Sequence, residues 1–145
     1  MSIVALVVLV YACSRASIKQ VSFTKNQDRT MEQMIAEAKL QKKVLFVDVY
    51  TSWCGPCKWM DENTFRDTRV TEKFNKMFLN YKVDGESFDG VNVGIIYRVD
   101  SYPTYLFISP NGEVLHRIEG MMSPESLINE ADFVAKRNTA SRTSR

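Results

Sequence analysis

Apolar and polar residues follow two different rhythms in the first half of the chain, and each rhythm predicts a different element. Over residues 30–41, apolar residues recur at helical spacing, with Met31, Met34 and Ile35 on one face. Residues 43–50 are almost continuously apolar, which is typical of a strand covered on both faces in the centre of an α/β sheet. The pattern predicts a helix followed by a central buried strand.

The same patterns place the remaining elements. Further strands are expected over residues 78–83, 104–109 and 114–119, and further helices over residues 57–65, 70–77, 91–97 and from Pro124 onward. Thr30 and Gln33 form a capping box, and Ser123 precedes a proline at the favoured first helical position. A βαβ half followed by a ββα half predicts an α/β domain, a central mixed β-sheet flanked by helices on both faces.

Length and composition fit one globular domain. The chain has 145 residues, of which 45% are hydrophobic and 25% charged, so its core needs no disulfide staples. The net charge is +2, and four basic residues without an acid stand in the last ten. Such an end could contact nucleic acid or an anionic membrane. Because it lacks aromatic residues, we expect a solvated, disordered tail over residues 138–145 and no nucleic-acid partner.

The N-terminal segment resembles an export signal. Residues 3–11 form an apolar run that is too short for a membrane-spanning helix but matches the core of a secretory signal. The run leads into Ala12 and Cys13, which resembles the cleavage box of a bacterial lipoprotein, although no Lys or Arg precedes it. We expect a signal over residues 1–13 with Cys13 as the lipidated residue, a tether over 14–26 and the domain over 27–137. A buried N-terminal strand carrying a core cysteine is the alternative.

The segment Cys54-Gly55-Pro56-Cys57 carries the candidate chemistry. It follows the central strand and opens a helix, where unpaired backbone N–H groups and the helix dipole favour an anion. The pKa of the Cys54 thiol should therefore fall, so that Cys54 attacks a disulfide and Cys57, one turn later, resolves the mixed disulfide. Pro56 fits the first helical turn, and Gly55 permits close approach of a partner's backbone.

Two other uses of a Cys-x-x-Cys pair are less well supported. Zinc would require about two further ligands, and the chain offers only Cys13 and His116, which form no second ligand pair. A purely structural disulfide would close a very small ring and add little stability. We expect no metal and no organic cofactor, because the two cysteines themselves form the redox centre.

Two further positions interrupt the pattern of their elements. Asp48 breaks an apolar strand six residues before Cys54, where a buried carboxylate is costly and has a raised pKa. We hypothesise that Asp48 accepts the proton of Cys57, the alternative being a strand face open to solvent. Pro103 precedes an expected strand, where proline is confined to first positions, edges or bulges, and a cis Tyr102–Pro103 bond would be a deliberate feature.

From Val44 to about Leu127 these residues resemble the thioredoxin superfamily. Trp53 before the two cysteines, the buried acid at its spacing and Tyr102-Pro103-Thr104 match the active site, the proton-transfer acid and the cis-proline loop of that family. The resemblance implies a thioredoxin fold. It also implies that clients contact Trp53, Gly55, Pro56 and Pro103, and that Tyr102 pairs its backbone with the substrate.

A closer likeness is to small exported bacterial thioredoxin-like proteins and to the C-terminal periplasmic domain of the electron-transfer protein DsbD. It rests on Asp48-Val49-Tyr50, Glu62-Asn63-Thr64-Phe65 and Val70. Two departures matter. The lysine that often accompanies the buried acid is assigned to Asn80, which leaves the tuning of Asp48 open, and the loop over residues 84–90 is longer than in cytosolic thioredoxins.

These resemblances imply a thiol–disulfide oxidoreductase that reduces disulfides of exported proteins. We expect a monomer in the bacterial cell envelope or periplasm, attached to the membrane only through Cys13. Its electrons would come from a membrane reductase, or from a flavin-dependent reductase if the protein is cytoplasmic. A net oxidase or isomerase and a non-catalytic module that docks clients remain as alternatives.

Overall fold

A five-stranded mixed sheet forms the centre of the computed structural model, which describes residues 20–143. Its order is β1–β3–β2–β4–β5, in which β1, β3 and β2 run parallel and β4 is antiparallel to both neighbours. The strands are β1 (Thr24–Lys25), β2 (Val44–Tyr50), β3 (Phe78–Asp84), β4 (Thr104–Ile108) and β5 (Val114–Glu119). The helices are α2 (Met31–Gln41), α3 (Gly55–Glu62), the 3₁₀ turn η1 (Thr64–Arg66), α4 (Thr68–Met77), α5 (Phe88–Tyr97) and α6 (Pro124–Thr143).

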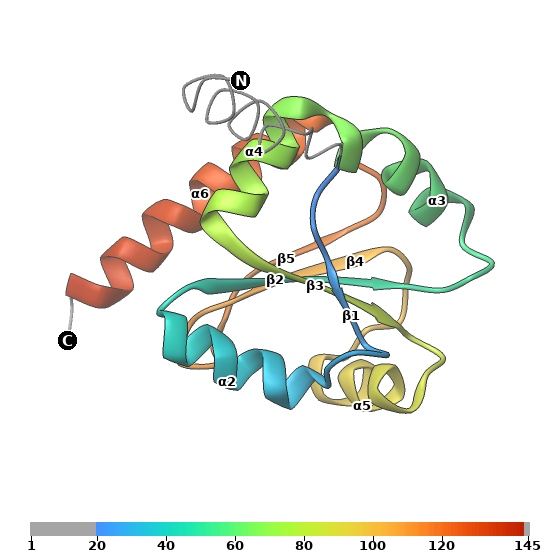
Figure 1. Ribbon diagram of the computed structural model, residues 1–145, viewed down its shortest axis with the longest axis horizontal. Helices are drawn as coiled ribbons and strands as arrows, with labels where there is room; N and C mark the ends of the chain where they lie inside the picture. The colour runs from blue at the N-terminus through green and yellow to red at the C-terminus, as the bar shows by residue number, and fades with distance from the viewer. Residues whose placement is uncertain (1–19, 144–145) are drawn as a thin grey trace, which may run out of the picture.

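The sheet separates two hydrophobic layers. Helices α2 and α5 lie on one face, and α3, α4 and α6 lie on the other (Figure 1). Alternate residues of β2 point to opposite faces, so Phe46 packs on the α4–α6 side while Leu45 and Val47 pack on the α2–α5 side. Asp48 has the same parity as Phe46, which places its side chain on the face covered by α3. The predicted α/β class and the central position of residues 44–50 are confirmed.

Local caps explain where several helices begin. The predicted capping box of α2 is present, because Thr30 accepts from the Gln33 N–H and the Gln33 side chain accepts from the Thr30 N–H. The Ser87 hydroxyl accepts from the Gly90 N–H, so α5 begins at Phe88, three residues earlier than predicted. The helix expected over residues 57–65 is also wrong at its end, since α3 stops at Glu62 and a 3₁₀ turn follows.

The predicted tether over residues 14–26 is wrong for the part that the structure describes. Val21 is buried to 2% exposure in the hydrophobic layer under α4 and α6, and β1 pairs with β3. The backbone N–H of Val21 donates to the Phe65 carbonyl at 2.8 Å. The alternating pattern Val21-Ser22-Phe23 carries this signal, but a two-residue strand is too short to stand out without its partner.

The C-terminal helix also runs further than expected. It continues to Thr143, so residues 138–143 are helical where the sequence predicted a disordered tail. Ala140 and Arg142 favour helix, and the Thr139 hydroxyl donates to the Ala135 carbonyl at 3.0 Å. The polar composition of this segment therefore did not indicate disorder, because residues 138–143 continue helix α6.

The predicted signal over residues 1–13, with Cys13, lies outside the described residues. Within residues 20–143, none of the helices combines the length and apolar character needed to cross a membrane.

Candidate active site

Cys54 and Cys57 form a disulfide at the N-terminus of α3. Their Cα atoms lie 5.3 Å apart, and both residues are 3% exposed. Cys54 is the N-cap of the helix, and the Cys57 backbone N–H donates to the Cys54 Sγ at 3.2 Å. After reduction the same N–H and the helix N-terminus favour a thiolate at Cys54, so the predicted placement of the pair is confirmed.

The residues between the two cysteines face solvent. Gly55 and Pro56 are exposed, and Pro56 occupies the first turn, where its missing N–H leaves no intrahelical bond unmade. A Cβ placed on Gly55 would have no heavy atom within 4 Å. An approaching polypeptide therefore meets open space beside the disulfide.

Trp53 forms an aromatic platform next to the cysteines. Its side chain is 65% exposed, its indole N–H donates to Glu86 Oε1 at 2.8 Å, and its ring stands edge-on to Tyr102 at 5.9 Å between centroids. Gly85 makes this arrangement possible, since a Cβ there would lie 2.7 Å from the Tyr102 ring. The loop at residues 85–87 therefore holds two of the predicted client-contacting side chains in place.

The Tyr102–Pro103 peptide bond is cis, as the sequence suggested. Pro103 is buried immediately before β4, and its carbonyl accepts from the Gly120 N–H at 2.9 Å. This bond ties the proline loop to the segment after β5, where Met121 is 55% exposed. Trp53 contacts Tyr102, so the proline loop lies beside the redox-active segment.

Asp48 is buried, so the alternative of a solvent-open strand face is wrong. Its residue exposure is 1%, and its Oδ2 accepts from Lys82 Nζ at 2.6 Å, while Oδ1 has no partner among the described residues. Burial raises the pKa of Asp48, and the nearby Lys82 ammonium only partly offsets this. The carboxyl can therefore bind a proton under milder conditions than an exposed aspartate.

The assignment of the partner lysine to Asn80 is wrong, because Lys82 holds this position. In the parallel register Asp48 pairs with Lys82, whereas Phe46 pairs with Asn80. Asn80 instead donates to the Phe74 carbonyl at 3.3 Å and helps to fix the start of β3. Both residues project on the same face, so only the register between strands distinguishes them, and register is a non-local property.

Asp61 is a residue of the site that the sequence analysis missed. Lys82 Nζ donates to Asp61 Oδ1 at 2.6 Å as well as to Asp48, so one ammonium joins two carboxylates. Burial lowers the pKa of Lys82, but the two carboxylates more than compensate and raise it overall. Asp61 lies four residues after Cys57 on α3, a spacing that places both on one side of the helix. This spacing is the sequence signal by which Asp61 could have been predicted as a residue of the site.

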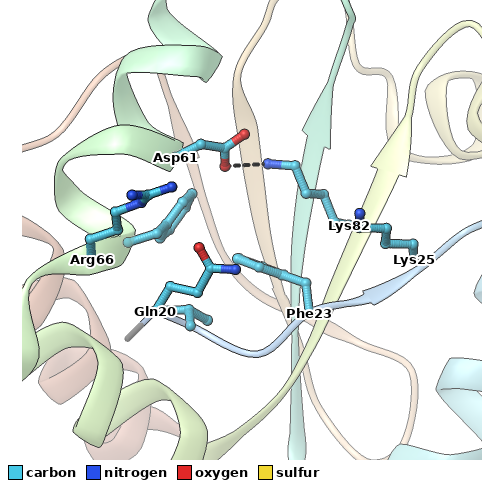
Figure 2. Close-up of a pocket in the computed structure, with 8 residues that line it drawn as sticks. Gln20, Phe23, Lys25, Asp61, Arg66 and Lys82 are labelled. Carbon is cyan, nitrogen blue, oxygen red and sulfur yellow. Dashed lines mark hydrogen bonds and ion pairs between the residues drawn. The ribbon is translucent and has the colours of Figure 1, made fainter. Parts of the chain in front are cut away.

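A cavity of about 210 Å³ borders this ion pair on the side of the N-terminal segment. In Figure 2, Lys82 extends from β3 toward Asp61 on α3, and Gln20 and Phe23 line the pocket beneath them. The Lys82 ammonium also lies 5.4 Å from the centre of the Phe23 ring. Residues that were expected to be a tether therefore form one wall beside the buried charges.

The raised pKa of Asp48 predicts how stability depends on pH. The folded protein binds this proton more tightly than the unfolded chain, so the folded state loses stability as pH rises from the ordinary aspartate range through the raised pKa. We expect Asp48→Asn to gain stability relative to the wild type as pH rises above about 4, the ordinary aspartate range. Urea unfolding at several pH values measures this, with the exposed Asp100→Asn as a matched control. A stability difference that does not change with pH would contradict it.

Comparison with known proteins identifies the family. A family model for a thioredoxin-like domain matches residues 31–135. The chain belongs to the thioredoxin-like family. A candidate disulphide-isomerase from Bacteroides thetaiotaomicron is 34% identical, with a TM-score of 0.71, over 83% of this chain and 97% of that one. A thioredoxin from Thermus thermophilus, 21% identical over 83% of this chain and 93% of that one with a TM-score of 0.73, shows the same fold.

Two of the curated relatives are longer than this thioredoxin-like chain. Thioredoxin Y, chloroplastic, of Oryza sativa subsp. japonica is 33% identical over 65% of this chain and 52% of its own length. The thiol:disulfide interchange protein DsbD of Pseudoalteromonas atlantica is 28% identical over 74% of this chain and 18% of its own length. The chain therefore spans about half of the first relative and less than a fifth of the second.

The fold, the family match and the Cys54–Cys57 disulfide place this chain in the thioredoxin-like family, close to thiol–disulfide oxidoreductases. In the part of the chain that the structure describes, no three His, Cys, Asp or Glu side chains are arranged to hold a metal ion. His116 on β5 is the single histidine of the sequence, and its Nε2 lies 2.6 Å from Glu130 Oε2.

Proposed function

We propose that the protein reduces disulfide bonds of exported proteins by cycling between a Cys54–Cys57 dithiol and disulfide. The observation that carries the proposal is the disulfide at the N-terminus of α3, on the face of the sheet that holds the buried Asp48–Lys82 pair. A nucleophilic thiolate and a proton acceptor are the two functions that this exchange requires.

The reaction transfers two electrons from the dithiol to the client. The Cys54 thiolate attacks one sulfur of the client disulfide, forms a mixed disulfide and releases the other client sulfur as a thiolate, which takes a proton from water. Cys57 then loses its proton and attacks the Cys54 sulfur. This closes the Cys54–Cys57 disulfide and releases the second client thiolate.

Asp48 would accept the proton that Cys57 loses. The link between them runs through Lys82, which contacts both Asp48 and Asp61, and Asp61 lies one helical turn after Cys57. A carboxyl with a raised pKa takes up a proton more readily than an exposed aspartate, which suits it to accept a proton and release it again. Cys54 and Cys57 are the catalytic residues of this proposal, and Asp48 is its base.

The client would bind over the exposed surface around the disulfide. Trp53 and Tyr102 offer an aromatic platform, Gly55 and Pro56 leave space beside it, and the cis Pro103 loop borders the same surface. Tyr102 would pair its backbone with an extended client segment. The likeness to DsbD supports clients outside the cytoplasm and a membrane reductase as electron donor. The resemblance of residues 10–13 to a lipoprotein cleavage box supports Cys13 as the lipid anchor, and we propose that the protein is a monomer.

The equilibrium potential of the cysteine pair tests the direction of electron flow. Protein equilibrated in glutathione or dithiothreitol buffers should give a potential more negative than about −220 mV if it acts as a reductant. A potential above roughly −180 mV would overturn the reductant role in favour of an oxidase or isomerase. The 34% identity to the candidate disulphide-isomerase makes isomerisation the second candidate function.

Asp48→Asn tests the proton role. Without the carboxylate we expect resolution of the mixed disulfide to slow by about 10²-fold near neutral pH and to recover at alkaline pH, where Cys57 ionises without a base. Rapid-quench measurement of the mixed disulfide across pH gives the rate of this step alone. Unchanged resolution at every pH would remove Asp48 from the mechanism while leaving the role of the cysteines intact.

A further inference from the structure

Tyr105 carries a buried hydroxyl that neither the fold nor the proposed reaction explains. It is fully buried on β4, and its hydroxyl oxygen has no hydrogen-bond partner among the described residues. Every other aromatic side chain buried in this hydrophobic layer is a phenylalanine. A phenol buried without a partner costs free energy that phenylalanine would not, so its presence calls for a use.

The other fully buried tyrosine shows the usual arrangement. Tyr81 lies on the opposite face of the sheet, and its hydroxyl lies 2.8 Å from the Arg29 carbonyl and 2.6 Å from Asp89 Oδ2. That hydroxyl therefore has two acceptors, whereas the Tyr105 hydroxyl has none. The contrast singles out Tyr105 within this chain.

Strand register places Tyr105 beside the buried acid. Asp48 on β2 and Tyr105 on β4 are direct cross-strand partners, so both side chains project from the same face. The Tyr105 ring stacks on Phe46 at 5.7 Å between centroids and meets Phe65 edge-on at 6.0 Å. These contacts hold the ring in one orientation next to Asp48.

Asp48 and Tyr105 each have a buried polar atom without a hydrogen-bond partner among the described residues, one an acceptor and the other a donor. Lys82 occupies Oδ2 of Asp48, while Oδ1 is buried and without a partner among the described residues. The Tyr105 phenol is a donor, and a charged carboxylate has capacity for several hydrogen bonds. We propose that Tyr105 is a positioning residue for the reaction, whose hydroxyl donates a hydrogen bond to Oδ1 of charged Asp48 through one buried water.

This inference rests on the proposed function and deepens it. With Lys82 on one oxygen and Tyr105 on the other, the carboxylate is stabilised in its charged form and held ready to take the proton of Cys57. Burial raises the pKa of Tyr105, and the charge of Asp48 raises it further, so the phenol remains a donor throughout the cycle.

Several other groups act on the charge of Asp48 and must be kept constant in any test. They come from three elements: Lys82 on β3, Asp61 on α3 and Tyr50 on β2. Tyr105→Phe leaves all of them in place, because it removes a single oxygen atom and keeps the ring that packs on Phe46 and Phe65.

The decisive experiment is a pH titration of the Asp48 carboxyl in the reduced protein, followed by carboxyl carbon NMR. Removing a hydrogen bond to the charged form should raise the midpoint in Tyr105→Phe by about one pH unit. At pH values well below the wild-type midpoint, the rate of resolution of the mixed disulfide should then fall about tenfold, because the charged fraction of Asp48 falls by that factor. In an Asp48→Asn background, Tyr105→Phe should have no further effect on that rate.

The matched control is Tyr81→Phe, which removes a buried hydroxyl on the opposite face and should leave the Asp48 midpoint unchanged. An Asp48 midpoint that is the same in Tyr105→Phe and in the wild type would overturn the inference and leave Tyr105 as core filling. The titration requires no client, so it tests Tyr105 even if the wild-type protein proves unable to reduce any disulfide, a result that would overturn the proposed function alone.

Discussion

Cys54→Ser is expected to abolish disulfide reduction, with a loss of turnover on the order of 10³-fold or more, because it removes the attacking atom. Cys54 is the N-cap of α3 and its sulfur already accepts the Cys57 backbone N–H, so the structure favours negative charge on this sulfur. Serine at the same place offers a hydroxyl that stays protonated at neutral pH. The measurement is reduction of a disulfide client in the presence of a dithiol donor.

Cys57→Ser is the matched variant for the same experiment. It also loses turnover, but it keeps the Cys54 thiolate, so it should accumulate a covalent complex with the client that a reducing agent releases. Non-reducing electrophoresis distinguishes the two variants directly. A covalent complex with Cys54→Ser and none with Cys57→Ser would reverse the assigned roles. A wild-type protein that binds clients without reducing them, together with undiminished client binding in both variants, would favour the non-catalytic docking module.

The redox site could be predicted from the sequence because its signals are local. Cys54 and Cys57 lie within four residues, and the strand before them and the helix after them are both visible in the hydrophobic pattern. Asp48 stands out because a charged residue interrupts an apolar strand, and Pro103 because proline marks a strand start. Each of these inferences depends only on neighbours in the chain. In the structure the cysteines lie at the start of α3, Asp48 is buried in β2 and Pro103 directly precedes β4.

The partners of Asp48 could not be found in the same way. Lys82 bonds to it from β3, Asp61 on α3 connects to it through Lys82, and Tyr105 on β4 is its cross-strand neighbour. Assigning them requires the register of one parallel and one antiparallel pairing, and a pattern within each strand fixes only which face a side chain occupies. The error between Asn80 and Lys82 is of this kind, since both project on the same face.

The predicted start of the domain at residue 27 was wrong for a related reason. β1 has two residues and gains its stability from pairing with β3 and from Val21 beneath α4 and α6, so little in its own sequence marks it as a strand. A polar segment that follows a signal-like run also resembles a tether in composition. Its contribution to the pocket beside Lys82 becomes visible only when the chain is folded.

The largest loss of stability is expected at the centre of the layer between the sheet and helices α4 and α6. The Phe46 side chain is 0% exposed, and six aromatic rings surround it with centroids between 4.8 and 6.4 Å away. Phe46→Ala removes the ring from all of these contacts at once and leaves a cavity that rigid aromatic neighbours fill poorly. We expect the free energy of unfolding to fall by about 3–5 kcal/mol, measured by urea denaturation of the oxidised protein.

Phe88→Ala is the matched control, because it deletes the same atoms at a residue that is 88% exposed at the start of α5. Its effect should stay within about 0.5 kcal/mol, since little apolar surface is returned to water. Equal losses in the two variants would show that Phe46 is not the centre of the core. The expected difference also bears on the redox site. Phe46 lies two residues before Asp48 on the same face of β2 and stacks on Tyr105, so the packing that stabilises this layer also fixes the surroundings of the buried acid.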